Sequence, residues 1–294
     1  MLKCKFFLIL VFLASSIAFA IPKEEKNALL DLYHSTNGSN WITSWQLTAP
    51  ISTWEGVLVE NNHVVGITLF NNNLRGTIPA SIGTLKKLKV LNLAFNSLSG
   101  QIPEDLYTLE HLITLRLGKN NLSGAIPNTI DGLVQISFLD LFDNKFTGEI
   151  PASIGSLKEL KVLSFSDNKF EGELPASLSN LKKLERLELA NNNLKGEFPN
   201  TIANIATLKS LVIAENGFSN RFPKSILAMP NLELLQIQRN NFDIAYLENI
   251  AQTESKLVVF DYDRSNTLLL ERDFKSIFPN KETRTAKTKF EDYE

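Results

Sequence analysis

The 294-residue chain has little of the chemistry that cofactor sites and nucleic-acid sites need. One cysteine and three histidines are too few to suggest a zinc site, a thiol enzyme or a disulfide scaffold. The 30 basic and 32 acidic side chains give a net charge of −2, without the basic surplus typical of nucleic-acid binding. With 44% hydrophobic and 21% charged residues, the composition excludes wholesale disorder. We therefore expect a folded protein that uses no metal, cofactor or nucleic acid.

Long hydrophobic runs are absent except at the N-terminus. Lys3 and Lys5 precede an apolar run over residues 6–13, and Ala18-Phe19-Ala20 fits a small-x-small cleavage pattern, so residues 1–20 are predicted to be a signal peptide. The alternative, an uncleaved anchor, would have only residues 6–21, fewer than the roughly 20 apolar residues that a spanning helix needs. The sequence predicts a secreted or cell-surface protein without a membrane span, whose mature form lacks cysteine because Cys4 is removed.

Leucine and asparagine are in excess, with 46 Leu and 29 Asn, and both are periodic. Asparagine recurs every 24 residues, at Asn72, Asn96, Asn120, Asn144, Asn168, Asn192, Asn216 and Asn240. Glycine follows four residues after the first six of these, and proline follows seven residues after the first seven. Residues 64–255 are thus predicted to form eight 24-residue repeats, because chance does not maintain such a register.

Each residue type in the repeat has a structural role. The segment L-x-L-x-x alternates apolar and polar residues, which predicts a short strand with one buried face. Asparagine ends the strand, and its amide can satisfy backbone groups of its own coil and of a neighbouring coil, so the eight residues are expected to form a ladder. One repeat cannot bury its apolar face alone, so the repeats are predicted to stack into an α/β solenoid with a parallel sheet.

The two ends of the stack need caps, because each would expose core and unpaired strand edges. Residues 21–63 are predicted to form an N-terminal cap with a helix over residues 24–34. Its Trp41, Trp45 and Trp54 are expected to fill the core, in preference to binding sugar. Residues 256–281 are predicted to form an irregular C-terminal cap in which residues 257–262 imitate a ninth strand and residues 268–270 and 274–278 close the end. Residues 282–294 are expected to be a polar, mobile tail.

The repeat resembles the plant-type leucine-rich repeat, whose signature L-x-G-x-I-P occurs here as residues 98–103, LSGQIP. That family includes the ectodomains of plant receptor kinases and polygalacturonase-inhibiting proteins. The cap segments at residues 28–33, 37–41 and 54–57 resemble its N-terminal caps, and their lack of cysteine resembles secreted members from bacteria and microalgae. The resemblance implies a right-handed horseshoe that presents its parallel sheet on the concave side.

The candidate binding residues are strand side chains that should point away from the core on the concave face. Aromatic and charged residues concentrate in the first four repeats: Phe70, Phe95, Arg116, Lys119, Phe138, Asp140, Phe142 and Asp143. Exposed aromatic rings beside fixed charges are typical of an interaction hot spot. The alternative, that the phenylalanines only cover the sheet by packing against one another, is equally consistent with the sequence.

Two functions remain open. The favoured one is a secreted, monomeric, non-catalytic recognition module that binds an extracellular protein or polysaccharide on its concave face. The alternative is a structural or adhesive cell-surface protein in which the repeats act as a spacer. An enzyme is not expected: Asp140, Asp143 and Asp167 could resemble a cation site or a glycosidase pair, but on a solvated sheet they are interpreted as surface charge.

Overall fold

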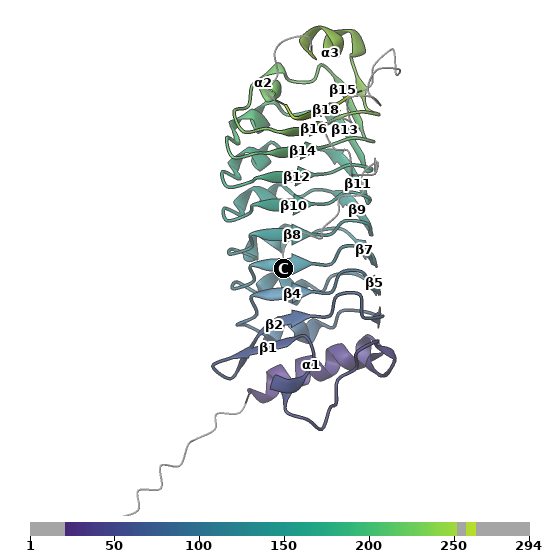
Figure 1. The fold of residues 1–294 in the computed structure, drawn as a ribbon, viewed down its shortest axis with the longest axis vertical. Coiled ribbons are helices and arrows are strands. Elements are labelled where there is room, and N and C mark those ends of the chain that lie inside the picture. Colours follow the sequence, from purple (N-terminus) through teal and green to yellow (C-terminus); the bar gives the residue numbers. More distant parts are fainter. Residues whose placement is uncertain (1–20, 252–256, 263–294) are drawn as a thin grey trace, which may run out of the picture.

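The computed structural model describes residues 21–251 and 257–262, which form an elongated stack of coils (Figure 1). The predicted solenoid with a parallel sheet is confirmed, and each coil contains one of the eight periodic asparagines; we number the coils from one (Asn72) to eight (Asn240). The proposed signal peptide, the apolar segments at 268–270 and 274–278 and the tail at 282–294 lie outside the described residues. No helix of the described part is long and apolar enough to cross a membrane.

The main sheet of the described residues has ten strands (Figure 1). Strands β2 to β18 are parallel, and Leu139, Leu163 and Leu187 lie side by side on neighbouring strands as the 24-residue period requires. Strand β1 pairs antiparallel with β2 and begins the sheet. The strands are β1 (Val57–Glu60), β2 (His63–Thr68), β4 (Val90–Asn92), β6 (Thr114–Arg116), β8 (Phe138–Asp140), β10 (Val162–Ser164), β12 (Arg186–Glu188), β14 (Ser210–Val212), β16 (Leu234–Gln236) and β18 (Val259–Asp261).

A second parallel sheet, of eight strands, runs beside the first and was not predicted. Its strands follow the periodic asparagines, and most contain a glycine with positive φ; in coil seven Asn220 takes that place with φ 65°. Asparagine is among the few non-glycine residues that tolerate this conformation. The strands are β3 (Arg75–Gly76), β5 (Ser97–Gly100), β7 (Asn121–Gly124), β9 (Lys145–Glu149), β11 (Lys169–Glu173), β13 (Asn193–Glu197), β15 (Gly217–Asn220) and β17 (Asn241–Phe242).

Short helices return each coil to the next strand. In coils one to seven each begins directly after the repeat proline, whose fixed φ suits a helix start and whose missing N–H is not needed there. The 3-10 helices of the repeats are η3 (Ala80–Thr84), η4 (Glu104–Thr108), η5 (Asn128–Gly132), η6 (Ala152–Ser156), η7 (Ala176–Asn180) and η8 (Asn200–Asn204). Coil seven has the α-helical turn α2 (Lys224–Leu227) at the same place.

The core is one continuous column of leucine, isoleucine and phenylalanine that runs through the described coils. Phenylalanine replaces leucine at several repeat positions, and these rings stack: the centroids of Phe165 and Phe170 lie 5.0 Å apart and those of Phe146 and Phe170 lie 6.1 Å apart. Because neighbouring coils share this column, each coil depends on both neighbours for its burial.

The periodic asparagines bond the backbone of successive coils. Asn144 Nδ2 donates to the carbonyl oxygens of Leu117 (3.0 Å) and Leu141 (3.1 Å), and Asn144 Oδ1 accepts from the N–H of Leu122 (2.9 Å). The pattern holds from Asn96 to Asn240. Asn72 instead bonds the cap, since its Oδ1 accepts from Thr43 N and its Nδ2 donates to Thr43 O.

The N-terminal cap contains the predicted helix as α1 (Lys23–Ser35), followed by η1 (Gly38–Asn40) and η2 (Ile51–Thr53). Ala28, Leu29 and Leu32 of α1 are fully buried against the first coil. The buried Glu25 joins α1 to the sheet: its carboxylate lies 2.6 Å from His63 Nδ1 and accepts from the N–H of Val64 at 2.8 Å.

The three tryptophans of the cap are buried and pack on one another. The ring centroids of Trp45 and Trp54 lie 4.8 Å apart, and those of Trp41 and Trp45 lie 4.9 Å apart. Each indole N–H donates to a backbone carbonyl, that of Thr36, Glu55 or Ala49. Their role is core packing, and none presents a ring for a sugar.

At the other end, β18 is the ninth strand that residues 257–262 suggested, with Phe260 beside Leu235 of β16. Before it, α3 (Ile244–Ala251) takes the place of the short helix in coil eight. This helix was not predicted, because the repeat register was extended to residue 255. The rest of the proposed C-terminal cap lies outside the described residues.

Candidate ligand-binding face

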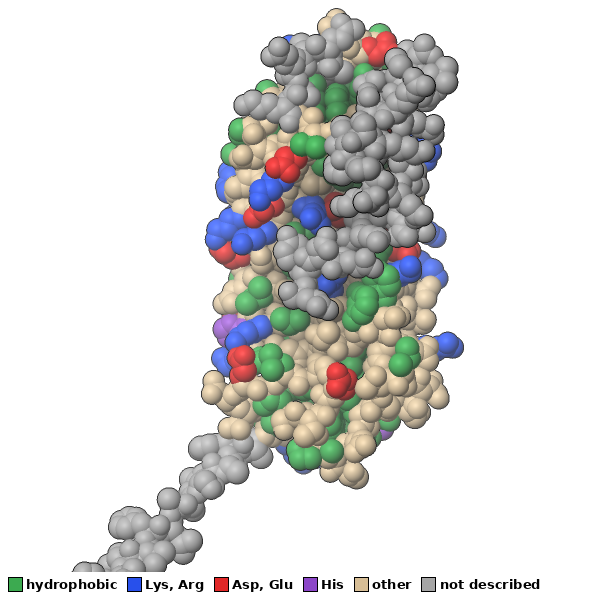
Figure 2. All heavy atoms as spheres, viewed as in Figure 1, with side chains coloured by type: hydrophobic (Ala, Val, Ile, Leu, Met, Phe, Trp, Pro, Cys, Tyr) green, Lys and Arg blue, Asp and Glu red, His purple; other side chains and the backbone are tan. Residues whose placement is uncertain are grey.

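The candidate site lies on the outer surface of the ten-stranded sheet, which we call the sheet face. Its side chains come from the positions one, two, four and six residues before each periodic asparagine. Figure 2 shows hydrophobic side chains on this face over the first coils, and charged side chains along both edges of the stack. The two halves of the face differ, so we describe them in turn.

Three phenylalanines from different coils meet in the first half, and we call them the aromatic cluster. The ring centroids of Phe70 and Phe95 lie 4.9 Å apart, and those of Phe95 and Phe142 lie 6.0 Å apart. Phe142 reaches across coil three because that coil has glycine at the equivalent position: a Cβ on Gly118 would lie 2.4 Å from Phe142 Cδ1. Gly118 therefore makes room for a ring from the next coil.

Two cations lie over phenylalanine rings. Lys119 Nζ is 5.0 Å from the centroid of Phe95, and Arg116 Cζ is 5.4 Å from that of Phe138. Both distances are within the range of cation–π attraction. The structure thus brings the sequence-selected aromatic residues and cations together on coils one to four.

The sequence left open whether the phenylalanines form an interaction hot spot or only cover the sheet, and their exposure is consistent with both. Phe70 is 47% exposed, whereas Phe95 and Phe142 are half-buried because they pack on each other. The rings do cover the sheet, and they also present apolar surface. Lys119 and Asp143 are exposed beside them.

Several candidate residues have a left-handed backbone, with φ of 60° at Phe95, 56° at Lys119 and 50° at Asp143. Such values can mark a functional site under strain. Here the residue before the asparagine has positive φ in every coil, including Asp167 at 57° and Arg239 at 57°. The conformation therefore belongs to the turn of the repeat.

Asp140 requires a correction. The sequence placed it among solvent-facing side chains, but it is fully buried, with Oδ2 3.8 Å from Arg116 Nε and Oδ1 accepting from the N–H of Phe142 at 3.2 Å. Burial raises the pKa of Asp140 from 3.8 to about 7, although the Phe142 N–H and the Arg116 guanidinium both oppose the shift.

In the second half of the face, side chains of coils five to seven are also buried where the strand pattern predicts exposure. Ser164 is 1% exposed and Glu188 2%, and the Ser164 hydroxyl donates to Glu188 Oε2 at 2.9 Å. Burial raises the pKa of Glu188, opposed by Arg186 and by the Ser164 hydrogen bond. Ala190, Val212 and Ala214 form a buried hydrophobic cluster separate from the core, with Leu234 packed against it. The run of small side chains was the only sequence signal for this difference.

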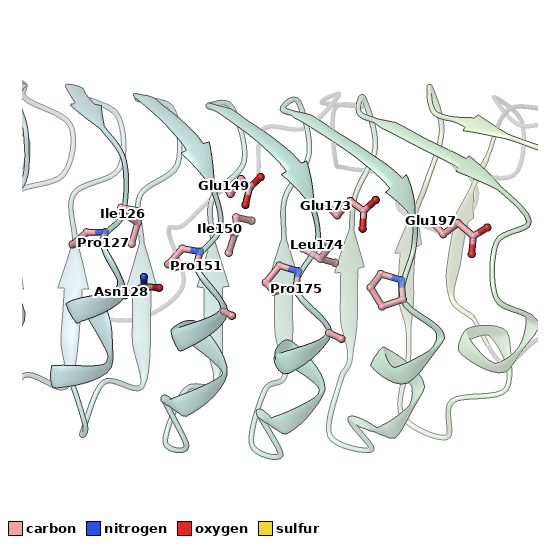
Figure 3. Close-up of a pocket in the computed structure, with 13 residues that line it drawn as sticks. Ile126, Pro127, Asn128, Glu149, Ile150, Pro151, Glu173, Leu174, Pro175 and Glu197 are labelled. Carbon is pink, nitrogen blue, oxygen red and sulfur yellow. The ribbon is translucent and has the colours of Figure 1, made fainter.

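A groove at the far ends of β9, β11 and β13 was missed by the sequence reasoning. Glu149, Glu173 and Glu197 point from successive coils toward the same side, above the repeat prolines, and the space has a volume of about 680 Å³ (Figure 3). Asn220 Nδ2 donates to Glu197 Oε1 at 2.7 Å. The 24-residue spacing of these glutamates was visible in the sequence. Within residues 21–251 and 257–262, no group of three His, Cys, Asp or Glu side chains is placed to hold a metal ion.

Solved structures with the same fold include plant receptors. Over 75% of this chain, the complex of PEPR1 with AtPEP1 matches with a TM-score of 0.70 and 28% identity. The Arabidopsis receptor kinase HAESA, in complex with the peptide hormone IDA and the co-receptor SERK1, matches 73% with a TM-score of 0.61 and 35% identity. This chain covers 32% and 35% of those two chains. A plant ice-binding protein matches 76% with a TM-score of 0.64 and 26% identity, and 81% of its own chain is covered.

Sequence comparison agrees with the structural likeness. A stretch of 52 residues is 44% identical to a probable leucine-rich repeat receptor-like protein kinase of Arabidopsis thaliana, covering 17% of this chain and 6% of that protein. The model of the leucine-rich repeat region matches residues 68–252, which is more than half of the chain. With its 24-residue coils, its parallel sheet and this match, the chain belongs to the leucine-rich repeat family.

Proposed function

We propose that this protein is a secreted, non-catalytic recognition module that binds an extracellular protein or peptide through the first half of its sheet face. The observation that carries the proposal is the aromatic cluster of Phe70, Phe95 and Phe142 with the cation Lys119 beside it. Partly exposed aromatic rings that are held by their neighbours lose little conformational entropy when a ligand covers them.

The fold supports a protein ligand. One of the solved relatives is a receptor kinase in complex with the peptide hormone IDA, and another is PEPR1 in complex with AtPEP1. Because this chain covers only about a third of those receptors, their ligands are not transferred to it, and only the kind of ligand is proposed. A polysaccharide is the second candidate partner, and the experiment below distinguishes it from a peptide.

Binding of ice, which the name of another relative describes, has less support here. A surface that matches a crystal lattice would repeat one side chain from coil to coil. Two residues before the asparagine, the described coils instead carry phenylalanine, alanine and glycine in turn, and then phenylalanine again.

The proposal is tested with two probes, a phage-displayed random-peptide library and a glycan array, applied to the full-length protein. Phe70→Ser removes the most exposed ring, and Val134→Ser, 52% exposed on the helical side, is the matched control. We expect selected peptides to bind Phe70→Ser about 30-fold more weakly, as for the loss of one hot-spot ring, and Val134→Ser unchanged.

Three outcomes contradict parts of the proposal. Equal peptide binding by both variants would place the site elsewhere, and binding confined to the glycan array would replace the peptide by a polysaccharide. If neither probe binds, the structural or adhesive spacer becomes the better interpretation. Unchanged melting temperatures of both variants ensure that a loss of binding is not a loss of folding.

Secretion is part of the proposal and has its own test. It rests on the cleavage pattern at residues 1–20, which lie outside the described residues. N-terminal sequencing of the protein recovered outside its native cells should find Ile21 as the first residue. Recovery of the chain inside the cells with residues 1–20 intact would contradict it.

A further inference from the structure

The charged side chains of the sheet face differ in whether the protein itself provides them with a partner. In the part of the chain that the structure describes, Lys119 and Asp143 form no ion pair and no side-chain hydrogen bond, whereas the other charged side chains of this face on coils three to eight do. Their contacts are Arg116 Nε to Asp140 Oδ2 (3.8 Å), Arg186 Nε to Glu188 Oε1 (3.7 Å), Arg239 Nη1 to Glu215 Oε1 (2.6 Å) and Asn191 Nδ2 to Asp167 Oδ1 (2.7 Å).

A second pair of coils shows what Lys119 and Asp143 could have done. Both lie one residue before a periodic asparagine, on the neighbouring coils three and four. Glu215 and Arg239 hold the same position on coils seven and eight, and they form an ion pair across one coil spacing. Lys119 instead lies over the ring of Phe95 on coil two, with Nζ 5.0 Å from the centroid. A cation–π contact attracts the ammonium group and leaves its positive charge unneutralised.

Leaving these two charges apart has little effect on folding. Both side chains are exposed, and an exposed ion pair contributes little to stability because water and salt already screen its charges. The stack of coils therefore does not require Lys119 and Asp143 to pair. The two charges are available to a ligand.

Both charges adjoin the aromatic cluster. Lys119 lies beside Phe95, and Asp143 directly follows Phe142 in the chain. A ligand that covers the two rings also removes water from the two charges. A charge that loses water without gaining an opposite charge weakens binding, so complementary charges give specificity. The site should therefore favour a ligand with a carboxylate for Lys119 and a cationic group for Asp143.

The spacing of the coils sets the distance between these two groups of the ligand. The backbones of coils three and four are about 4.8 Å apart, and the Lys119 side chain is directed toward coil two, away from Asp143. The two ligand charges should then be one to two coil spacings apart, or about 5–10 Å. An extended peptide advances about 3.3 Å per residue, so the distance corresponds to two or three residues.

We propose that the ligand is a peptide segment with an acidic and a basic residue two or three positions apart, beside an apolar residue that covers the aromatic cluster. Lys119 binds the acidic residue and Asp143 binds the basic one. This inference rests on the proposed function, because it specifies the peptide that the aromatic cluster binds. The two charges also orient the ligand, with its acidic residue toward coil two and its basic residue toward coil four.

Peptides selected from the phage-displayed random library on the full-length protein are the probe. We expect the selected sequences to be enriched in the acidic and basic pair. A synthetic copy in which an amide replaces the acidic side chain should bind the wild-type protein about 10-fold more weakly. Lys119→Met keeps a long apolar side chain without the charge, so this variant should bind the acidic peptide and its amide copy alike.

Exchanging the two charges tests the orientation of the ligand. Glu215 and Arg239 have φ of 56° and 57° at the same repeat position, so the backbone accepts Lys119→Glu with Asp143→Lys. We expect this double variant to bind a selected peptide at least about 10-fold more weakly than the wild type does. A peptide with its acidic and basic residues exchanged should show the reverse preference.

Lys169→Glu with Glu171→Lys is the matched control. It exchanges two exposed charges on β11 of the eight-stranded sheet and, like the double variant, leaves the net charge unchanged. This control should bind the selected peptides as the wild type does. Melting temperatures equal to that of the wild type verify that all variants are folded.

The outcomes separate this proposal from the proposed function. Selected peptides that lose binding to Phe70→Ser but bind the charge-exchanged variant as tightly as the wild type would overturn the proposal and leave the proposed function in place. An equal loss from the amide copy in the wild type and in Lys119→Met would also overturn it, because the acidic residue would then contact another group. If the wild-type protein selects no peptide, both proposals fail.

Discussion

The first and second halves of the sheet face share one backbone and differ in almost everything attached to it. Coils one to four carry aromatic rings that are partly exposed, whereas coils five to seven carry buried side chains that are mostly small, together with the buried Glu188. The periodic asparagines are the same in both halves, and the core beneath them is built from large apolar side chains in both. A repeat protein can therefore separate its folding residues from its surface residues, and the surface can change from one coil to the next without a change of fold.

Asp140, at the border of the two halves, is where the largest effect is expected. Because its pKa is near 3.8 in the unfolded chain and about 7 in the folded one, the folded state binds the proton more tightly. Its contribution is most favourable below pH 4 and is lost as the pH rises to 7. Relative to Asp140→Asn, the wild-type protein should lose about 3 kcal/mol of unfolding free energy between pH 4 and pH 7.

Urea denaturation over this pH range measures the effect. Asp143→Asn changes an exposed carboxylate three residues away and should leave the wild-type pH profile in place. If the unfolding free energy depends on pH in the same way in Asp140→Asn and in the wild type, Asp140 is solvated. The buried part of the sheet face would then not begin at coil four.

The ladder of periodic asparagines should contribute equally to stability in the two halves, in contrast to the side chains of the sheet face. Asn120 in the first half and Asn192 in the second each donate to three carbonyl oxygens and accept from one backbone N–H. Substitution by alanine leaves these buried groups without their partner, so both variants should lose about 3 kcal/mol. Chemical denaturation measures both. A much larger loss at one site would show that the two halves differ in their core as well as on their surface.

The smallest effect tests how Phe142 is positioned. Gly118→Ala places a Cβ against the Phe142 ring, and we expect a loss of about 1 kcal/mol together with weaker peptide binding. Alanine occupies the same repeat position in coils two, six and seven, so the backbone itself accepts it. In a Phe142→Ala background, Gly118→Ala should therefore be much less destabilising, because the contacts with the ring are gone and the 2.9 Å contact with Asp140 Oδ1 remains. If it remains equally destabilising there, the contact with Phe142 is not its cause.

The sequence predicted the features that repeat and missed those that depend on neighbours. The period alone placed the strands of the ten-stranded sheet and the asparagines, whereas the short helices of the coils were not predicted. The second sheet was missed because a strand was predicted only for the segment before each asparagine, whereas the glycines with positive φ that follow six of the asparagines lie within strands as well. Helix α3 was missed because the 24-residue register was carried past the point where local sequence favours a helix.

The candidate site was predicted as columns of residues, without the contacts between them. Phe142 meets Phe95 only because Gly118 between them has no side chain, and a repeat pattern does not report such a reach across a coil. The burial of Asp140 likewise depends on its neighbours, since it lies beside Arg116 and accepts from the N–H of Phe142. Apolar–polar alternation within a strand shows on which side of the sheet a side chain lies, but it does not show how much of that side chain is exposed to solvent.

The parallel stacking of the coils also sets a scale for any ligand that lies across the strands. Coils follow one another at about 4.8 Å, whereas an extended peptide advances about 3.3 Å per residue. Three peptide residues therefore cover nearly the same length as two coils. Every third residue of such a peptide would therefore lie at the same position relative to every second coil. Phe95 of coil two and Phe142 of coil four would then contact residues of such a peptide that are three positions apart.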